Sequence, residues 1–121
     1  MDKYTDSYRS YVDLLVSVAS TGASNVLHVK NANTFTISSH FTVTTGAVTA
    51  VVINLEGTLD QSKWFTLGEY TYTAADLTAL QAMFHVINKH VSHVRLNLAT
   101  FTKSGTANFN AKLSYQPFTF V

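Results

Sequence analysis

The chain has 121 residues, the size of one ordinary domain, and only 12% of them are charged against 46% hydrophobic, so we expect burial against neighbouring subunits. Its eight Lys and Arg residues are scattered and the formal net charge is +1, which argues against a nucleic-acid partner. The absence of cysteine excludes a disulfide framework and a thiolate metal site. Neither a secretion signal nor an apolar run of membrane-spanning length is found, so we expect a soluble protein made in the cytoplasm, with no membrane partner.

The first eleven residues have the pattern of an N-terminal arm. Tyr4, Tyr8 and Tyr11 are spaced i, i+4 and i+7, which places them on one face of a helical segment. Two interpretations remain open: the arm (residues 1–11) docks on a neighbour, or its tyrosines cover the end of this subunit's own sandwich.

Short alternating runs with turn residues between them predict β-strands through most of the chain. A first strand has one apolar face made by Val12, Leu14, Val16 and Val18. A second apolar face, on one bent strand or two joined ones, is made by Phe35, Ile37, Phe41 and Val43. Residues 51–65 predict a hairpin with its turn at residues 60–63, in which Val51, Ile53, Leu55 and Leu59 share one parity. These runs are typical of a sandwich or barrel.

A helical period interrupts the strands once. Leu77, Leu80 and Phe84 recur at i, i+3 and i+7, and Thr73 with Asp76 three residues later predicts a capped helix over about residues 74–81.

The last third of the chain predicts a second hairpin. Alternation over residues 94–98 and 109–115 is separated by the turn residues 103–105. Pro117 cannot donate a ladder hydrogen bond, so residues 117–121 are expected to form an edge segment or a C-terminal arm.

Together these elements predict an all-β fold over residues 1–121: a single antiparallel β-sandwich, jelly-roll-like, with one short helix. The predicted core consists of Val12, Leu14, Val16, Ile37, Val51, Ile53, Leu55, Trp64, Leu96, Leu98 and Leu113.

Trp64, the only tryptophan, has two readings. A buried indole would anchor the core, whereas an exposed one would serve as a platform on which a sugar stacks. We expect the core anchor.

Residues that could carry catalysis or bind metal do not form a convincing set. Glu56 and Asp60 would lie about 13 Å apart along a strand, beyond the roughly 5–9.5 Å that separates glycosidase carboxylates. His85, His90 and His93 are close in sequence but lack diagnostic zinc spacing. Nucleophile, phosphate-loop and dinucleotide motifs are missing. We therefore expect no enzyme activity, no cofactor and no metal site.

The residues predicted to form interfaces combine the two arms with one arginine. Arg95 lies on the polar parity of its strand, where it either keeps its head group in water or contacts a neighbouring subunit. The full predicted interface set is Tyr4, Tyr8, Tyr11, Arg95, Phe118 and Phe120.

Three blocks of sequence resemble small all-β virion proteins of tailed phages: residues 33–37, residues 55–60 with Trp64, and residues 93–98 with the Gly105 turn. This resemblance implies a capsid decoration, head auxiliary or tail component that is located in the virion, binds capsid or adjacent structural subunits, and is homo-oligomeric, with a trimer favoured. It implies no catalytic residue.

The second and third blocks also look like discoidin-type sandwiches, which share a turn of the form S-x-D-G-x-x-W and a later V-R-L strand. That likeness implies the alternative function, a carbohydrate-binding module that recognises host-surface glycans through Trp64 and nearby tyrosines.

Overall fold

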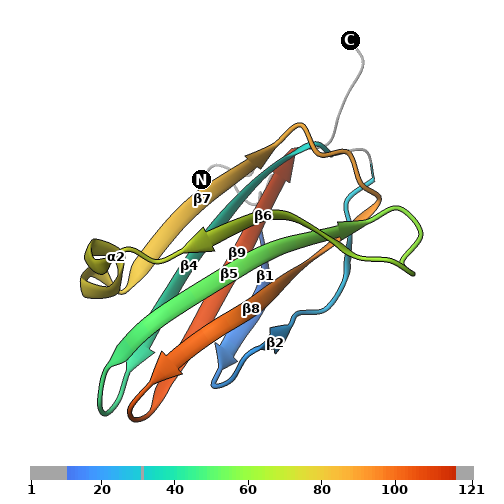
Figure 1. The fold of residues 1–121 in the computed structure, drawn as a ribbon. Coiled ribbons are helices and arrows are strands. Elements are labelled where there is room, and N and C mark those ends of the chain that lie inside the picture. Colours follow the sequence, from blue (N-terminus) through green and yellow to red (C-terminus); the bar gives the residue numbers. More distant parts are fainter. Residues whose placement is uncertain (1–10, 31, 117–121) are drawn as a thin grey trace, which may run out of the picture.

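The computed structural model describes residues 11–30 and 32–116, which form two antiparallel sheets packed face to face (Figure 1). The four-stranded sheet has the order β1 (Tyr11–Val18), β9 (Ala107–Gln116), β4 (Thr34–Val43) and β7 (Gln81–Ile87). The five-stranded sheet has the order β2 (Gly22–Ala23), β8 (His93–Lys103), β5 (Val48–Thr58) and β6 (Phe65–Thr71), with β3 (Leu27–His28) also paired to β8. The predicted all-β sandwich is confirmed.

The connections follow a jelly roll. The first strand pairs with the last in one sheet, β2 pairs with β8 in the other, and β4 and β5 follow each other in opposite sheets. A double-sheet jelly roll has this wrapped order because each sheet combines strands from both halves of the chain.

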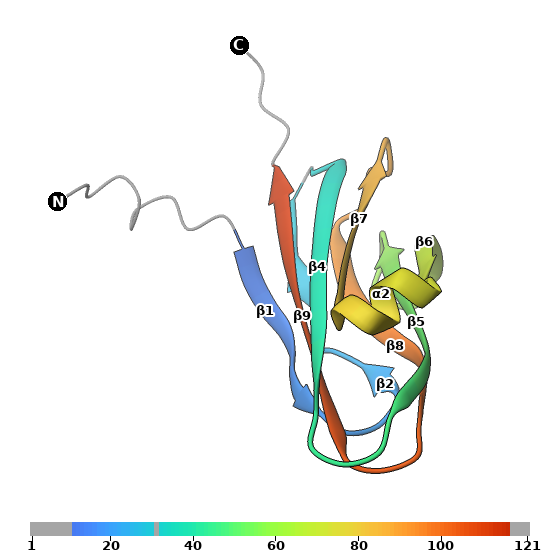
Figure 2. The ribbon, with the colours of Figure 1, turned by 90° about the vertical axis from the view of Figure 1, so that its left-hand side faces the viewer.

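The predicted second hairpin is wrong, because β8 and β9 lie in different sheets. Strand β9 pairs instead with β4 over ten residues, and the turn at residues 104–106 crosses from one sheet to the other. It stacks on the β4–β5 crossing, where Thr106 N donates to Thr45 O at 3.1 Å; both crossings lie at the same end of the molecule (Figure 2). A Cβ on Gly105 would lie 2.3 Å from Thr45 O, so this close approach requires glycine.

The predicted first hairpin is confirmed as β5 and β6, with its turn at Asp60. Asp60 Oδ1 accepts hydrogen bonds from Ser62 N at 2.8 Å and Lys63 N at 3.1 Å. Thr58 is buried and its hydroxyl accepts from Gln61 N, so the alternation ends there. Leu59 is therefore 76% exposed, and its predicted place on the inner face is wrong.

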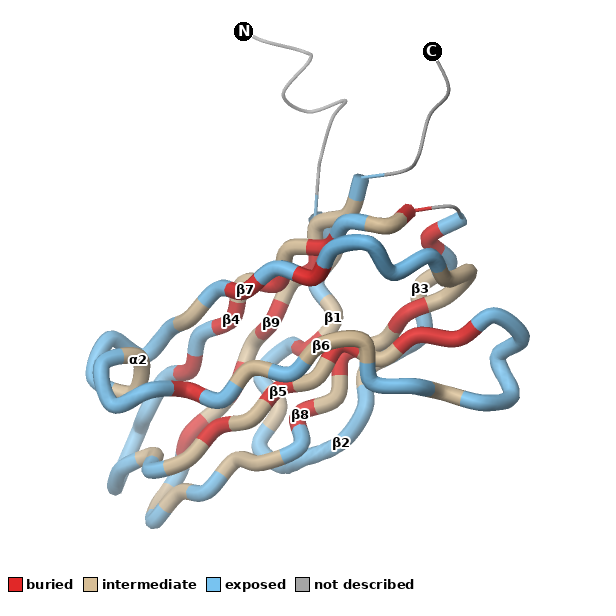
Figure 3. The backbone as a smooth tube through the Cα atoms, turned by 45° about the horizontal axis from the view of Figure 1, so that its top comes forward, coloured by how far each residue is buried: buried red, intermediate tan, exposed pale blue. Residues whose placement is uncertain are grey.

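The core lies between the sheets, where buried positions recur along β4, β9, β5 and β8 (Figure 3). The predicted core members that are buried are Ile37, Val51, Ile53, Leu55, Leu96, Leu98 and Leu113. Strand β4 is a single strand that buries Phe35, Ile37 and Phe41. The inner layer also holds an aromatic cluster around Phe109, which contacts Tyr72 and Phe101.

Strand β1 departs from the prediction that Val12, Leu14, Val16 and Val18 form one inner face. Register shifts on both sides of Leu15 change its pairing with β9. Leu15 is buried as a result, whereas Val16 is 63% exposed. A bulge inserts a residue and so changes which side chains face inward. Leu14 and Val18 still pack partly against the core, whereas Val16 does not belong to it.

Helix α2 (Ala74–Ala79) confirms the predicted helix and its cap, although it ends two residues earlier than expected. Asp76 N donates to Thr73 Oγ1, and Thr73 N donates to Asp76 Oδ2, which satisfies two otherwise unpaired donors. Leu80 follows with φ 65° and directs the chain into β7.

No helix in the described part of the chain is long and apolar enough to cross a membrane.

Candidate binding surface

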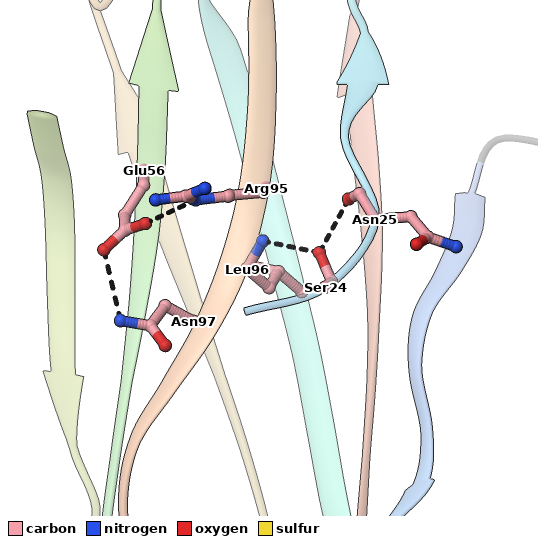
Figure 4. A network of polar contacts seen from close by, with 6 residues as sticks. All are labelled: Ser24, Asn25, Glu56, Arg95, Leu96 and Asn97. Carbon is pink, nitrogen blue, oxygen red and sulfur yellow. Dashed lines mark hydrogen bonds and ion pairs between the residues drawn. The ribbon is translucent and has the colours of Figure 1, made fainter. Parts of the chain in front are cut away.

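A polar cluster occupies the outer face of the five-stranded sheet. Glu56 on β5 lies directly opposite Arg95 on β8, and Arg95 Nε donates to Glu56 Oε1 at 2.7 Å. Asn97 Nδ2 donates to the other carboxylate oxygen at 3.2 Å (Figure 4). Both oxygens therefore have partners, and the Glu56 side chain is only 14% exposed, so the pair is better shielded than an ordinary surface ion pair.

Trp64 joins this cluster and does not belong to the core. The Arg95 guanidinium carbon lies 4.2 Å from the centroid of the Trp64 ring, within cation–π range, and Trp64 is only partly buried. The prediction of a core anchor is wrong because Trp64 precedes β6 and lies over the outer face of the sheet. One face of the indole is covered by the guanidinium and is closed to a stacked sugar.

Ser24 extends the same sheet where β2 ends. Ser24 Oγ accepts from Leu96 N at 2.9 Å and donates to Asn25 O at 2.8 Å, as Figure 4 shows. Its amide also donates to Leu96 O at 2.7 Å. These contacts hold the β2–β3 segment against β8, so they complete the sheet edge.

An apolar pocket of about 390 Å³ opens beside the β5–β6 turn. Gly57, Leu67 and Val91 line it, and they pack so closely that a Cβ on Gly57 would lie 2.6 Å from Leu67 Cδ1 and 3.0 Å from Val91 Cγ1. Phe65 lines the pocket although it is 63% exposed. The remaining lining residues are Thr58, Leu59, Asp60, Lys63 and His90. A hollow with an apolar wall and a charged rim can accept an apolar side chain from a partner.

A second pocket, of about 380 Å³, lies between β4, β7 and α2 and is lined in part by Ser39, His40 and Asp76. These residue types resemble a catalytic set, but Ser39 and His40 are consecutive on β4 and project to opposite faces. The Ser39 hydroxyl lies 2.6 Å from the Tyr72 hydroxyl and also donates to Ala82 O. The Ser39 hydroxyl is therefore already hydrogen-bonded within the protein, to Tyr72 and to the backbone of β7.

Two tyrosines and one carboxylate near this pocket have shifted pKa values. The hydrogen bond from the Tyr70 hydroxyl to Asp76 raises the pKa of Tyr70 and lowers the pKa of Asp76. Burial raises the pKa of Tyr72 to about 12. Burial outweighs the hydrogen bond with Ser39, which acts on the pKa of Tyr72 in the opposite direction.

The structure does not bring the three histidines together. His85 on β7 lies 3.0 Å from Thr36 Oγ1 in the four-stranded sheet, whereas His93 on β8 stacks on His28 at 4.6 Å between ring centroids. His90 lies in the loop between them, 3.4 Å from Asn33 Nδ2. Within residues 11–30 and 32–116, no three His, Asp or Glu side chains form a group that could hold a metal.

The two carboxylates considered as a pair have separate structural roles. Glu56 binds Arg95 and Asn97, whereas Asp60 closes the hairpin turn. Hydrogen bonds from the backbone of Ser62 and then Lys63 lower the pKa of Asp60.

The predicted interface set divides into described and undescribed members. Tyr4, Tyr8, Phe118 and Phe120, with most of the N-terminal arm and the whole C-terminal arm, lie outside the described residues. Tyr11 begins β1 in the four-stranded sheet, where the Lys112 ammonium lies 4.7 Å from its ring centroid. Arg95 lies on β8 in the other sheet, so the structure does not bring these two residues together. The sequence did not predict the pocket at Gly57, although a glycine at an inward-facing position of an alternating strand is a signal for a close approach.

The fold is a jelly-roll sandwich, and it is similar to folds found among solved structures. The crystal structure of the SPBc2 prophage-derived protein YomS superposes with a TM-score of 0.59 and 8% sequence identity, covering 88% of this chain and 92% of that chain. No protein-family model and no curated protein sequence matches this chain. The similarity to discoidin-type sandwiches finds no support in these comparisons.

Proposed function

We propose that this protein is a structural subunit of a tailed-phage particle, a capsid decoration or head auxiliary protein that binds the capsid or a neighbouring virion protein. The observation that carries the proposal is the jelly-roll fold shared with nearly the full length of a prophage-derived protein. The resemblance of residues 33–37, 55–60 and 93–98 to phage virion proteins supports the same assignment. The proposal involves no catalytic step, no nucleic acid and no membrane.

The pocket beside the β5–β6 turn is the surface that we assign to the particle contact. Phe65 and Leu59 are 63% and 76% exposed and lie next to an apolar hollow. Exposed large apolar side chains beside a pocket are typical of a protein–protein contact. Lys63 and Asp60 at the rim would orient the partner.

The test is recovery of the protein with purified particles produced by the phage or prophage that encodes it. We expect the wild-type protein in a fixed ratio to the major capsid protein, and its absence from washed particles would contradict the proposal. Phe65→Ser should reduce incorporation at least tenfold without lowering the melting temperature. Val26→Ser, at an exposed valine that does not line the pocket, is the matched control and should incorporate normally.

The same variants separate the particle role from glycan recognition. If the protein were a glycan-binding module, an array of host-surface glycans would give hits that Trp64→Ala abolishes and Phe65→Ser leaves unchanged. An array without hits, together with loss of particle binding in Phe65→Ser, supports the structural role. Unchanged incorporation of Phe65→Ser would reject the pocket as the contact.

A further inference from the structure

Three of the four sheet edges carry features that oppose pairing with another strand. Strand β1 has two register shifts and includes Asp13. The edge opposite β6 consists of two separate two-residue strands, β2 and β3. Strand β6 has a register shift against β5 and includes Glu69. Short strands, bulges and charges are the devices by which proteins prevent edge-to-edge association.

Strand β7 has none of these features. Its seven residues pair with β4 in continuous register from His40–Gln81 to Thr34–Ile87. It contains no Asp, Glu, Lys, Arg or Pro. It has a strand neighbour on one side only, within the described part of the chain, and α2 lies close to its first residues (Figure 2). The segment from Met83 to Ile87 is therefore an open, regular edge.

The side chains of this edge are self-complementary. Met83 and Ile87 are 57% and 59% exposed and lie two residues on either side of His85, on the outer face. If two copies of β7 pair antiparallel about His85, Met83 of each copy lies opposite Ile87 of the other. Two apolar cross-strand pairs then form, with no charged pair to oppose them.

We propose that β7 is the contact between two copies of this chain, which join their four-stranded sheets into one continuous sheet around a twofold axis at His85. A second copy is the occupant that the pattern favours, because an isologous contact needs one surface and β7 supplies both halves of it. The inference does not depend on a phage origin. A single strand pair covers less than the roughly 1,200–2,000 Å² of a standard interface, so we expect dissociation in the micromolar range.

Sedimentation velocity on the full chain from about 1 to 500 µM tests the proposal. We expect a monomer–dimer equilibrium, and the double substitution Met83→Lys with Ile87→Lys should keep the protein monomeric with an unchanged melting temperature. Val16→Lys, at a similarly exposed position on the opposite edge of the same sheet, should dimerise like the wild type. A monomer at all concentrations, a trimer, or a dimer unaffected by the double substitution would overturn the proposal.

Disulfide trapping tests the register, because the natural chain has no cysteine. Under mild oxidation, an equimolar mixture of Met83→Cys and Ile87→Cys should form a covalent dimer, since directly opposed Cβ atoms are about 4.5–5.5 Å apart. Each variant alone should not, because its two thiols would lie about 13 Å apart along the strands. Equal cross-linking of a single variant, or none in the mixture, would reject pairing about His85.

Discussion

The two outer faces of the sandwich have the same alternating backbone but different chemistry. On the five-stranded sheet, Glu56, Arg95 and Asn97 satisfy one another and Trp64 covers the arginine. The outer face of the four-stranded sheet instead carries uncharged side chains along β7, including Met83 and Ile87. A face whose polar groups are already paired gains little from a partner, whereas the uncharged outer side of β7, next to an open strand edge, loses little by being covered.

The largest effect is expected when an inward-facing residue of β8 is replaced, compared with an outward-facing residue of the same strand. Leu96 points into the core between Arg95 and Asn97, so Leu96→Ala should lower the free energy of unfolding by about 2–5 kcal/mol. Urea unfolding followed by circular dichroism measures this. Thr100→Ala, on the outer face of the same strand, is the control and should change stability by about 0.5 kcal/mol or less.

Removing the Glu56 carboxylate should show that the polar cluster on the five-stranded sheet contributes to stability. Glu56→Ala leaves Arg95 and Asn97 without their acceptor, and we expect a loss of about 1–2 kcal/mol. Thr36→Ala on the four-stranded sheet, which removes only the contact to His85, should cost about 0.5 kcal/mol. A double-mutant cycle with Arg95→Ala isolates the pair, and equal losses for Glu56→Ala and Thr36→Ala would remove the distinction between the faces.

Trp64 tests whether the cluster lies outside the core. Trp64→Ala should cost about 1 kcal/mol, the size of a cation–π contact with some packing, and not the roughly 3–5 kcal/mol of a core aromatic residue. The fluorescence of this single tryptophan should be accessible to acrylamide, and Arg95→Ala should increase the quenching. A blue-shifted spectrum resistant to the quencher would place the indole inside.

The last prediction concerns Tyr72, which lies in the layer between the two sheets and matters only at high pH. Burial raises the pKa of Tyr72 in the folded state to about 12, above the ordinary value of about 10 in the unfolded chain. The neutral Tyr72 therefore contributes fully to the free energy of unfolding below about pH 10, and this contribution is lost as the pH rises through the folded-state value. Stability should therefore fall between about pH 10 and 12. Tyr72→Phe should weaken this dependence, as thermal unfolding across that range would show; an unchanged slope would assign the effect to other groups.

The fold was accessible from the sequence because alternation identifies which side chains face inward. Alternation correctly predicted the hairpin at Asp60, and the helical spacing with its capping pair correctly predicted the helix capped by Thr73. Alternation does not identify the partner strand, and a short Gly105 turn suits a hairpin and a sheet crossing equally well, so β8 and β9 were joined wrongly. The bulges around Leu15 and the position of Trp64 over Arg95 depend on cross-strand contacts that no local pattern encodes.

The pairing of β1 with β9 has a consequence for the order of folding. Residue 11 is matched with residue 114, so the four-stranded sheet cannot close until almost the whole described segment is available. During synthesis the apolar side chains of β1 therefore remain exposed to solvent until β9 has been made. Contacts between residues so far apart in the sequence also form slowly. A molecular chaperone that holds nascent apolar segments should raise the yield of native protein.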